Sequence, residues 1–495
     1  MKFLLTRVDI RVVLSPIPDK PKRVSPKVQR QMQRQRPIAL ARRVDFHHVL
    51  RWVAYVLLAL SLTTAVFLSG GVYASQWQWV AVGIALGSCL CLSVPARSAA
   101  PQATSWEVRI MGMLLLWMGI QLTPLPPAAV RFLSPERWNT EIAARMATGF
   151  DLGAWLPLSV APGATLERLL YVVPAMAVFI AASEMARWWR SRYLWRIVAP
   201  VICAACLESL LGLTQFFSVR AAGPESNPVS GSYVNRNHFA GLLEMAFPLA
   251  VMWAIAIWMR ASRRSEPSAF KTSMLLVISG CILVSVIASL SRMGFVATLV
   301  AMAIIALAWM LAWGRKLRFR GCRLLWLLPL VLPLATLVFV STNAMVLRFA
   351  SLPQAGELTT EGRIQIWKET AQLIHTFKWA GCGLGAFEHG LFRFRTFAPT
   401  NTVDFAHNDY LQILAELGIV GFVLIGALMI RIFRPVLSVA LTPDSRHWAL
   451  AVGLLGSFIA IGLHSLVDFN LYIPANALAL AWLAGVATSP GLTEA

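Results

Sequence analysis

About twelve apolar runs occupy most of the chain between residues 49 and 487. A helix that crosses the hydrocarbon core of a bilayer needs about 20 mostly apolar residues, and most of these runs approach that length. Composition agrees, because 57% of the 495 residues are hydrophobic and 14% are charged, against roughly 25% charged residues in soluble proteins. The sequence therefore predicts an all-α, polytopic membrane helical bundle of about 12 transmembrane helices and excludes an ordinary soluble enzyme. The runs lie at 49–71, 78–95, 108–122, 168–183, 194–217, 238–259, 272–289, 293–313, 323–341, 409–430, 447–463 and 470–487.

Basic residues are unevenly distributed among the polar segments between these runs. The loops 96–109, 184–196, 260–271, 314–323 and 431–447 together contain 18 Lys and Arg residues, whereas the intervening segments, of more than twice that total length, contain 13. Cytoplasmic loops of membrane proteins carry an excess of Lys and Arg. We therefore expect a multi-pass protein with an even number of spans and with both termini in the cytoplasm.

The N-terminal segment is strongly basic. Residues 1–51 carry thirteen Lys and Arg against three Asp, which is almost half of the chain's net charge of +21. The segment also contains five prolines and no sustained apolar period, a pattern typical of disorder. We expect residues 1–48 to form a disordered cytoplasmic arm attracted to anionic lipids. Nucleic acid is not an expected partner.

The topology divides the rest of the chain. Residues 49–487 are expected to form one transmembrane domain with outer segments at 123–167 and 342–408, and residues 488–495 a cytoplasmic tail. In the second outer segment, apolar residues at helical spacing (Ile364, Trp367, Ala371 and Ile374) predict an amphipathic helix over Glu361–Phe377 that lies on the membrane domain. The glycine-rich stretch Gly381–Gly385 that follows would suit a turn whose backbone N–H groups bind a diphosphate.

Polar clusters at the predicted membrane boundary all fall on the outer side. They occur at 233–241, 289–294, 361–363, 405–410 and 464–470. A binding or catalytic site is therefore expected at this end of the bundle. The charged and titratable residues gathered there are Arg220, Arg236, Arg292, Arg363, His238, His407, His464 and Asp468.

Arg292 is the most informative of the arginines. Only a few residues separate the apolar runs on either side of it, so its guanidinium must lie at or within the lipid boundary, where an isolated charge is costly. It either extends to the lipid headgroups or binds an anion, for which the planar guanidinium suits phosphate. Arg363 has the same two alternatives, an anion site or a solvated helix face.

His407 lies among Asp404, Asn408 and Asp409, directly before an apolar run. Histidine titrates near neutral pH and is a natural general base for a hydroxyl nucleophile, but a capping or interfacial role explains the same position, and Asn408 or Asp409 would suit a helix cap. The outer segments contain no Asp-x-Asp pair and no His-x-x-x-His spacing. We therefore expect no metal and no other cofactor. Glu208, Glu244 and Glu416 lie inside predicted spans, where carboxylates are functional or paired.

Several of these motifs resemble one family. His407-Asn408, nine residues, and then Gly418-Ile419-Val420-Gly421 resemble the His-Asn/Ser/Gln, nine-residue, Gly-x-x-Gly signature of the O-antigen ligase and O-antigen polymerase superfamily. The segments 235–240 and 289–292, and Gly362-Arg363 with Trp367, also resemble the family's pattern. So does the order of parts, with a large outer loop before the histidine helix. The similarity extends over about residues 160–487.

This resemblance implies a GT-C-like fold and a specific reaction. The family transfers a glycan from undecaprenyl diphosphate to an acceptor hydroxyl on the periplasmic side of the bacterial inner membrane, with inversion and without a metal. It implies catalytic roles for His407, Arg292 and Arg363, with His407 either the base or a residue that orients substrate. Substrate-binding roles are implied for Arg220, Arg236, Asn237, His238, Asn408 and Asp468.

Different functions remain compatible with the sequence. The favoured acceptor is lipid A-core, which would make the chain an O-antigen ligase. An O-antigen or exopolysaccharide polymerase or a protein O-oligosaccharyltransferase would use the same chemistry on another acceptor. A bicarbonate or other small-anion transporter belongs to a different class and should carry interrupted helices with polar groups at mid-bilayer. A scaffold for a polysaccharide complex would tolerate the loss of Arg292 and His407.

Overall fold

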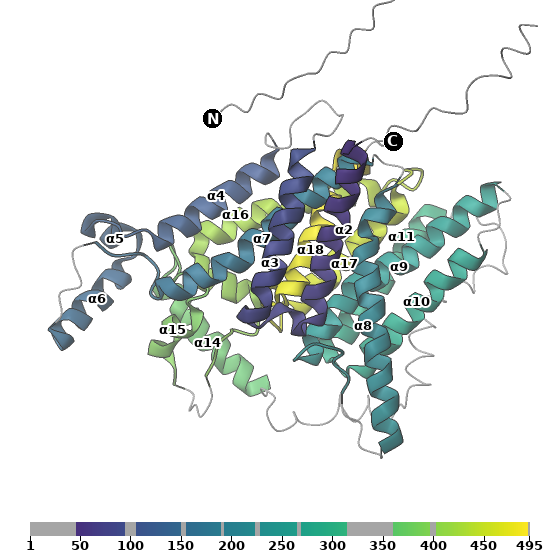
Figure 1. The fold of residues 1–495 in the computed structure, drawn as a ribbon. Helices are drawn as coiled ribbons and strands as arrows, with labels where there is room; N and C mark the ends of the chain where they lie inside the picture. The colour runs from purple at the N-terminus through teal and green to yellow at the C-terminus, as the bar shows by residue number, and fades with distance from the viewer. Residues whose placement is uncertain are drawn as a thin grey trace, which may run out of the picture. The chain divides into compact units, whose positions relative to one another are not determined.

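The computed structural model describes residues 46–94, 105–149, 155–189, 193–222, 228–264, 269–313, 360–396 and 402–493. Nearly all of these residues are helical (Figure 1), and within these ranges β-structure is limited to an isolated antiparallel bridge between Leu125 and Leu156. Helices satisfy every backbone hydrogen bond within one segment, which is the requirement for crossing lipid. The predicted polytopic, all-α class is confirmed.

Eleven of the twelve predicted apolar runs coincide with helices in the described residues. The ninth, 323–341, lies outside them. Eight of the helices are long and apolar enough to span a membrane: α2, α3, α7, α8, α9, α10, α11 and α16. The bounds are α2 Phe46–Phe67, α3 Ala74–Ser93, α4 Trp106–Leu122, α7 Pro162–Trp188, α8 Leu194–Ala222, α9 Arg236–Arg264, α10 Ala269–Ala288, α11 Arg292–Trp313, α16 Asp409–Ala440, α17 Trp448–His464 and α18 Pro474–Ala487.

Local sequence explains where several helices begin. Proline is the first residue of α7 and of α18, a position at which its missing N–H costs nothing. The Ser105 hydroxyl accepts a hydrogen bond from the N–H of Val108 and caps α4. The Asn408 side chain caps α16, which confirms one of the two predicted caps.

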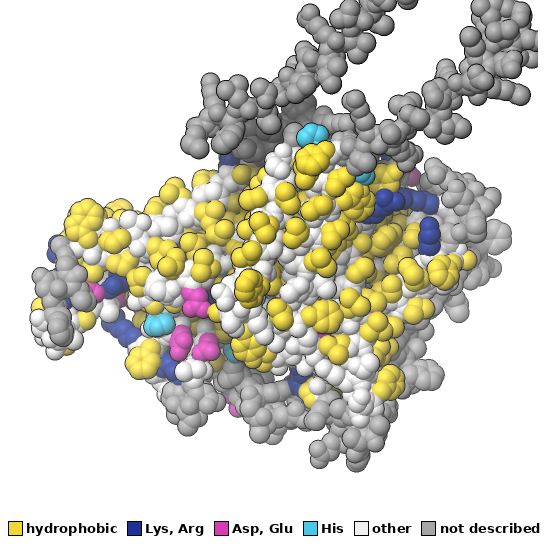
Figure 2. All heavy atoms as spheres, viewed as in Figure 1, with side chains coloured by type: hydrophobic (Ala, Val, Ile, Leu, Met, Phe, Trp, Pro, Cys, Tyr) yellow, Lys and Arg dark blue, Asp and Glu magenta, His cyan; other side chains and the backbone are white. Residues whose placement is uncertain are grey.

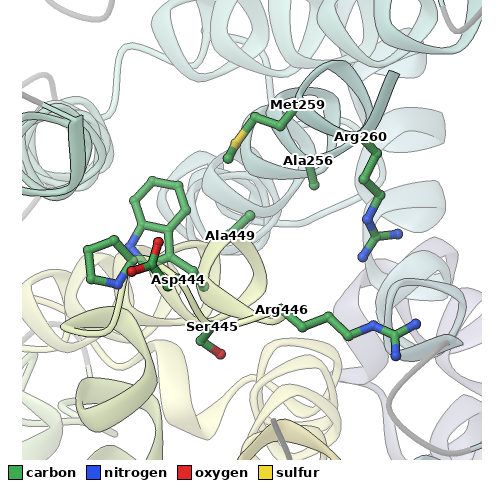
Figure 3. A pocket seen from close by; sticks show the side chains of 9 residues that line it. Ala256, Met259, Arg260, Asp444, Ser445, Arg446 and Ala449 are labelled. Atoms are coloured by element: carbon green, nitrogen blue, oxygen red, sulfur yellow. The ribbon is translucent and has the colours of Figure 1, made fainter. Parts of the chain in front are cut away.

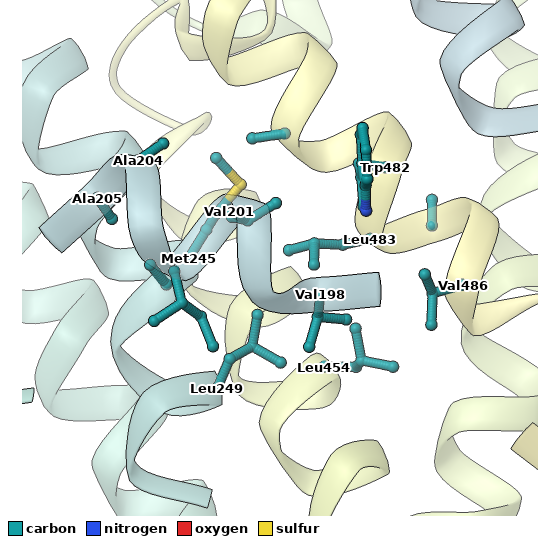
Figure 4. Packing of buried hydrophobic residues seen from close by; sticks show 14 of the residues in the cluster. Val198, Val201, Ala204, Ala205, Met245, Leu249, Leu454, Trp482, Leu483 and Val486 are labelled. Carbon is teal, nitrogen blue, oxygen red and sulfur yellow. The ribbon is translucent and has the colours of Figure 1, made fainter. Parts of the chain in front are cut away.

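The described residues from Leu50 onward form one compact unit. Within it, α9 packs most extensively against α17 and α10, α18 packs against α7, and α11 packs against α17. The closest approach of α18 and α7 needs a glycine, because a Cβ on Gly485 would lie 2.2 Å from the Phe179 carbonyl oxygen. Figure 4 shows the aliphatic side chains at the centre of this packing, including Val198 and Val201 of α8, Met245 and Leu249 of α9, Leu454 of α17 and Leu483 of α18.

Large apolar side chains also cover the outside of the described helices (Figure 2). Trp79 of α3 is 74% exposed and Leu116 of α4 is 65% exposed. Apolar surface on this scale is expected only where the environment is itself apolar. The hydropathy of the helices and the exposed apolar faces together describe a multi-pass membrane protein.

The two outer segments contain short helices. The first forms α5 Pro127–Leu133 and α6 Pro135–Thr148, and the second forms α14 Thr360–Thr376, α15 Phe387–Leu391 and a 3-10 turn at Phe392–Phe394. The helix predicted over Glu361–Phe377 is therefore confirmed as α14. At the C-terminal end, Pro490–Thr493 form a short helix, α19, that packs against α16 and α7.

The buried face of α14 differs from the predicted one. Ile366 and Leu373 are fully buried, whereas Ile364 of the predicted apolar stripe is 43% exposed. Glu369 also faces inward, because its Oε1 accepts hydrogen bonds from the N–H and hydroxyl of Thr396 at 2.9 and 2.8 Å. The buried face of α14 therefore carries Ile366, Glu369 and Leu373 in place of the predicted stripe.

Candidate functional site

Several helix ends meet around the connection between α17 and α18, residues 465–473. α9 and α16 begin beside it. The N–H of Asp409 in α16 donates to the carbonyl of Ser465 at 2.9 Å, and the Asn476 amide of α18 donates to the carbonyl of His238 at 2.9 Å. The polar clusters at 233–241, 405–410 and 464–470, which are far apart in the sequence, are therefore adjacent.

Asp468 is the centre of this meeting point. Its Oδ2 accepts a hydrogen bond from the Asn237 amide at 2.8 Å, and its Oδ1 accepts one from the N–H of Phe469 at 2.9 Å. The same Oδ1 lies 3.6 Å from His238 Nε2 and 3.7 Å from His407 Nδ1. One buried carboxylate therefore contacts two histidines from different helix starts. We call Asn237, His238, His407 and Asp468 the Asp468 cluster.

Burial and charge act in opposite directions on Asp468. Burial by itself raises the pKa of this carboxyl, but contacts with His238 and His407, and the more distant His464, lower the pKa well below its usual range. Asp468 is consequently ionised at every pH at which the protein is expected to work. The Asp468 side chain is 2% exposed, against 20% for that of His407 and 6% for that of His238. His407 is therefore the more accessible of the two histidines, and the buried Asp468 carboxylate lies behind it.

The backbone at His407 is held in an unusual conformation. Its φ is +50°, in the left-handed region that non-glycine residues rarely adopt. The next residue fixes it, because Asn408 Oδ1 accepts from the N–H groups of Tyr410 and Leu411 at 3.0 and 3.1 Å while its Nδ2 donates to the Leu466 carbonyl at 2.9 Å. Asn408 is thus a helix cap, and its predicted substrate-binding role has no support from this geometry.

Aromatic rings pack beneath the two histidines. The ring of Phe469 lies 4.6 Å from that of His238 and 5.0 Å from that of His407, centroid to centroid, and it stacks on Phe405 at 4.1 Å. Arg168 of α7 lies beside this group, with its guanidinium carbon 4.9 Å from the centroid of the Tyr472 ring. The imidazoles are therefore held between apolar rings and a single carboxylate, which restricts their orientation.

The predicted diphosphate-binding turn at 381–385 is wrong. Each of its five N–H groups already donates within the protein: to Phe377 O, Ala415 O, Glu416 O, the Gln121 side chain and the Glu416 carboxylate, in sequence order. A phosphate would have no donor left to accept from. The stretch instead anchors the outer segment to α16.

A break in α16 makes this anchoring possible. Gly418 has φ +64° and ψ −171°, a conformation accessible essentially to glycine alone, and it interrupts the helix. The carbonyls of Ala415 and Glu416 are thereby free to accept from Cys382 and Gly383, at 2.9 and 3.0 Å. The first glycine of the Gly-x-x-Gly motif therefore has a structural role.

Arg363 lies on the half-buried side of α14. One turn further along that helix, the Trp367 indole N–H donates to the carbonyl of Ala406 at 2.9 Å, directly before His407. Residues four apart share a helix face, so Arg363 projects from the face that contacts the His407 segment. Its Nε is buried and has no hydrogen-bond partner among the described residues.

Arg292 is the first residue of α11 and is half-buried. The start of α11 lies against the start of α9, because a Cβ on Gly294 would be 2.6 Å from the Cβ of Ala240. Ala240 is two residues from His238. Ala297 also packs on Ala460, near the end of α17. Arg292 is therefore at the same end of the bundle as the Asp468 cluster.

The three carboxylates inside predicted spans are all paired. Glu208 accepts from the Ser232 hydroxyl at 2.6 Å, Glu244 lies 3.0 Å from His464, and Glu416 accepts from the Tyr472 hydroxyl at 2.7 Å. His464 is accordingly a buried partner of Glu244. Within the described ranges, no group of three or more His, Cys, Asp and Glu side chains has the geometry to hold a metal ion.

Comparison with known families adds an independent finding. Residues 276–426 match the family model described as O-antigen ligase. This segment is about three tenths of the chain, and the match supports the resemblance to the O-antigen ligase superfamily that its motifs indicate. A search of curated proteins gives no match.

The O-antigen ligase segment, 276–426, contains the three predicted catalytic residues and Asn408. The other members of the Asp468 cluster come from outside this segment, and they reach His407 only through the fold. Arg236 is the first residue of α9, next to Asn237. Arg220 lies near the end of α8, and its side chain is outside the part of the molecule that the structure describes.

Sequence reasoning missed Arg168 and the aromatic rings. Arg168 is in the second turn of α7 and donates to the carbonyl of Tyr472 at 3.4 Å. The available signal was a basic residue near the outer start of a span, but three other arginines, Arg131, Arg137 and Arg145, lie in the outer segment before it. Phe405 and Phe469 lie within the polar clusters 405–410 and 464–470, but sequence does not show which rings meet.

Replacement of Asp468 by Asn is expected to destabilise the folded protein by about 2 kcal/mol, because two histidines and an amide lose a buried anionic partner. The folded-state pKa of Asp468 is depressed, so its contribution is complete above the unfolded value of about 3.9 and is lost as the pH falls through the folded value. Thermal unfolding in detergent should show a difference between wild type and Asp468→Asn that persists from pH 8 to 5 and shrinks only in stronger acid. A difference that disappears near pH 6 would contradict this assignment.

Proposed function

We propose that the chain is a glycosyltransferase that moves a glycan from undecaprenyl diphosphate to an acceptor hydroxyl on the periplasmic side of the bacterial inner membrane. Lipid A-core is the favoured acceptor, and both termini are cytoplasmic. The observation that carries the proposal is the accessible His407 held on the buried, ionised Asp468. Two arginines of the O-antigen ligase segment support the same proposal. Arg292 is the first residue of α11, and Arg363 lies in the first turn of α14.

The proposed reaction is a single inverting displacement. The acceptor oxygen attacks the anomeric carbon as the bond from that carbon to the diphosphate oxygen breaks, and the acceptor proton passes to His407. Asp468 stabilises the imidazolium that forms. Negative charge develops on the departing diphosphate, and in this proposal Arg292 and Arg363 bind it through charge-assisted hydrogen bonds. Two guanidinium groups supply this stabilisation without a metal.

The membrane explains why such a site lies at helix ends. A polyprenyl chain is apolar and remains in the bilayer, while its diphosphate and glycan remain at the polar boundary. The exposed apolar faces of the spans and the polar Asp468 cluster match those two parts of the donor. The outer helix α14 contacts the His407 segment through Trp367 and would cover the sugar.

The decisive experiment uses purified full-length protein with a defined undecaprenyl diphosphate oligosaccharide. Lipid A-core, a second donor molecule and an acceptor protein are offered separately, with and without chelator, and product masses are measured. Ligation to lipid A-core in chelator is expected. Products extended by whole repeat units would assign a polymerase instead, and turnover abolished by chelator would reject the metal-independent displacement.

Replacement of Arg292 by Ala is expected to lower kcat about 100-fold, because one donor to the leaving diphosphate is lost. Arg363→Ala should act in the same direction. Arg292→Lys keeps the charge without the bidentate geometry and should recover only part of the rate. Lys368→Ala is the matched control, since Lys368 is an exposed cation on α14. Unchanged turnover in Arg292→Ala would remove the anion-binding role.

A further inference from the structure

A pocket lies at the end of the bundle opposite to the Asp468 cluster. Its volume is about 340 Å³, and it is formed by the last turns of α9 and the connection from α16 to α17 (Figure 3). α9 has 29 residues, which at 1.5 Å per residue is roughly 43 Å and exceeds the bilayer's hydrocarbon thickness of about 30 Å. The pocket is therefore separate from the proposed glycan site, on the other side of the membrane.

The pocket carries two guanidinium groups from different parts of the chain. Figure 3 shows Arg260 of α9 and Arg446 of the α16–α17 connection extending to the same side, while Asp444 is on the other. His447 adds no charge, because burial, Arg446 and Arg260 lower its pKa to about 4. Two cations against one carboxylate give the pocket a positive balance at neutral pH.

The remaining wall is apolar, with one unusual polar atom. Ala256, Met259 and Ala449 line the pocket. Trp448 lines it too and is 2% exposed, yet its indole N–H is buried without a hydrogen-bond partner among the described residues. Buried donors are almost always paired. A ligand oxygen accepting from this N–H would complete the site.

We propose that this pocket binds the phosphate headgroup of an anionic membrane phospholipid, with Arg260 and Arg446 contacting the phosphate and the apolar wall contacting the glycerol and upper acyl chain. Guanidinium groups bind phosphate in a bidentate manner, and basic pockets between membrane helices recognise lipid headgroups. The apolar wall favours a lipid over a free phosphate ester. This inference is independent of the proposed glycan transfer.

The test is native mass spectrometry of delipidated full-length protein in detergent, titrated with dioleoylphosphatidylglycerol or dioleoylphosphatidylcholine. Phosphatidylglycerol should bind more tightly to wild type, and Arg446→Ala should weaken it about tenfold, as expected for the loss of a charge-assisted contact. Arg434→Ala is the matched control, because Arg434 is an exposed cation of α16 that does not line the pocket. It should change binding less than twofold. Arg446 is exposed, so its replacement leaves the core intact.

A second variant and a soluble probe separate the alternatives. Ala449→Leu fills the pocket while it keeps every charge, and it should also weaken phosphatidylglycerol binding. Equal affinity for both lipids, or no effect of Arg446→Ala, would overturn the proposal. Weakening by Arg446→Ala but not by Ala449→Leu would mean attraction to a basic surface rather than a pocket. If glycerol 3-phosphate bound as tightly as phosphatidylglycerol, the ligand of the pocket would be a soluble phosphate ester and the lipid proposal would be wrong.

Discussion

Replacement of His407 by Ala is expected to lower kcat for glycan transfer about 1,000-fold, the usual scale for the loss of a general base. His407 is the more exposed of the two histidines in the Asp468 cluster, and in the proposed reaction the ionised Asp468 behind it would stabilise the positive charge that develops on the imidazole. The measurement is turnover of a defined undecaprenyl diphosphate oligosaccharide by purified protein. Retention of wild-type turnover would remove His407 from the mechanism.

Two further variants make this result specific. His389→Ala is the matched control, because His389 is an exposed histidine in α15 of the same outer segment, and it should keep wild-type activity. His407→Gln distinguishes the two roles that His407 can have. An amide can orient an acceptor through hydrogen bonds but cannot take its proton. A general base therefore predicts a glutamine variant as inactive as the alanine variant, whereas an orienting residue predicts substantial recovery.

Replacement of Gly418 by Ala is expected to destabilise the fold by about 3 kcal/mol or more. The positive φ of Gly418, with ψ near 180°, disfavours any side chain, and a Cβ there would lie 2.3 Å from the Trp379 carbonyl oxygen. The contact is with backbone, so no side chain can move aside to relieve it. The break in α16 and the anchoring of 381–385 to it should be lost together.

Gly426→Ala provides the control within the same helix. Gly426 lies in α16, has no positive φ, and a Cβ there would meet nothing within 4 Å. This variant should match or exceed wild-type stability, because alanine is the better helix former. Thermal unfolding and the yield of monodisperse protein in detergent measure both variants. Equal stability of Gly418→Ala and Gly426→Ala would mean that the glycine conformation at the break in α16 does not contribute to the stability of the fold.

Most of the fold was predictable because a bilayer leaves few choices. Apolar runs of sufficient length must become helices when no water is present to satisfy the backbone, and α8, α9 and α10 follow their predicted runs closely. The buried face of α14 was predicted wrongly, because its sequence carries a second apolar stripe at helical spacing, Ile366, Leu373 and Phe377, and that stripe is the buried one. Tertiary contacts choose between the two stripes, among them the hydrogen bond that the N–H of Thr396 donates to Glu369.

The site was predictable as a location more than as an arrangement. The Lys and Arg counts of the loops assigned each loop to one side of the membrane. Because successive spans connect alternate sides, this assignment placed Arg292, His407 and Asp468 at the same end of the bundle. Which groups touch was beyond sequence: Asp468 bonds Asn237, 231 positions away. The prediction of a diphosphate-binding turn at 381–385 was wrong for the same reason. Its N–H groups would suit an anion, but the distant carbonyls of Ala415 and Glu416 accept from two of them.

The sequence by itself determined the helical membrane class, the approximate bounds of its spans, the family resemblance and the end of the bundle that carries the polar residues. These properties depend on local composition and on contacts between near neighbours along the chain. Only the tertiary structure decided that Asp468 lies beside two histidines, that Asn408 rather than Asp409 is the cap, and that Gly418 breaks α16. Those outcomes depend on which distant donors and acceptors meet, because each buried polar group must find a partner wherever the packing provides one.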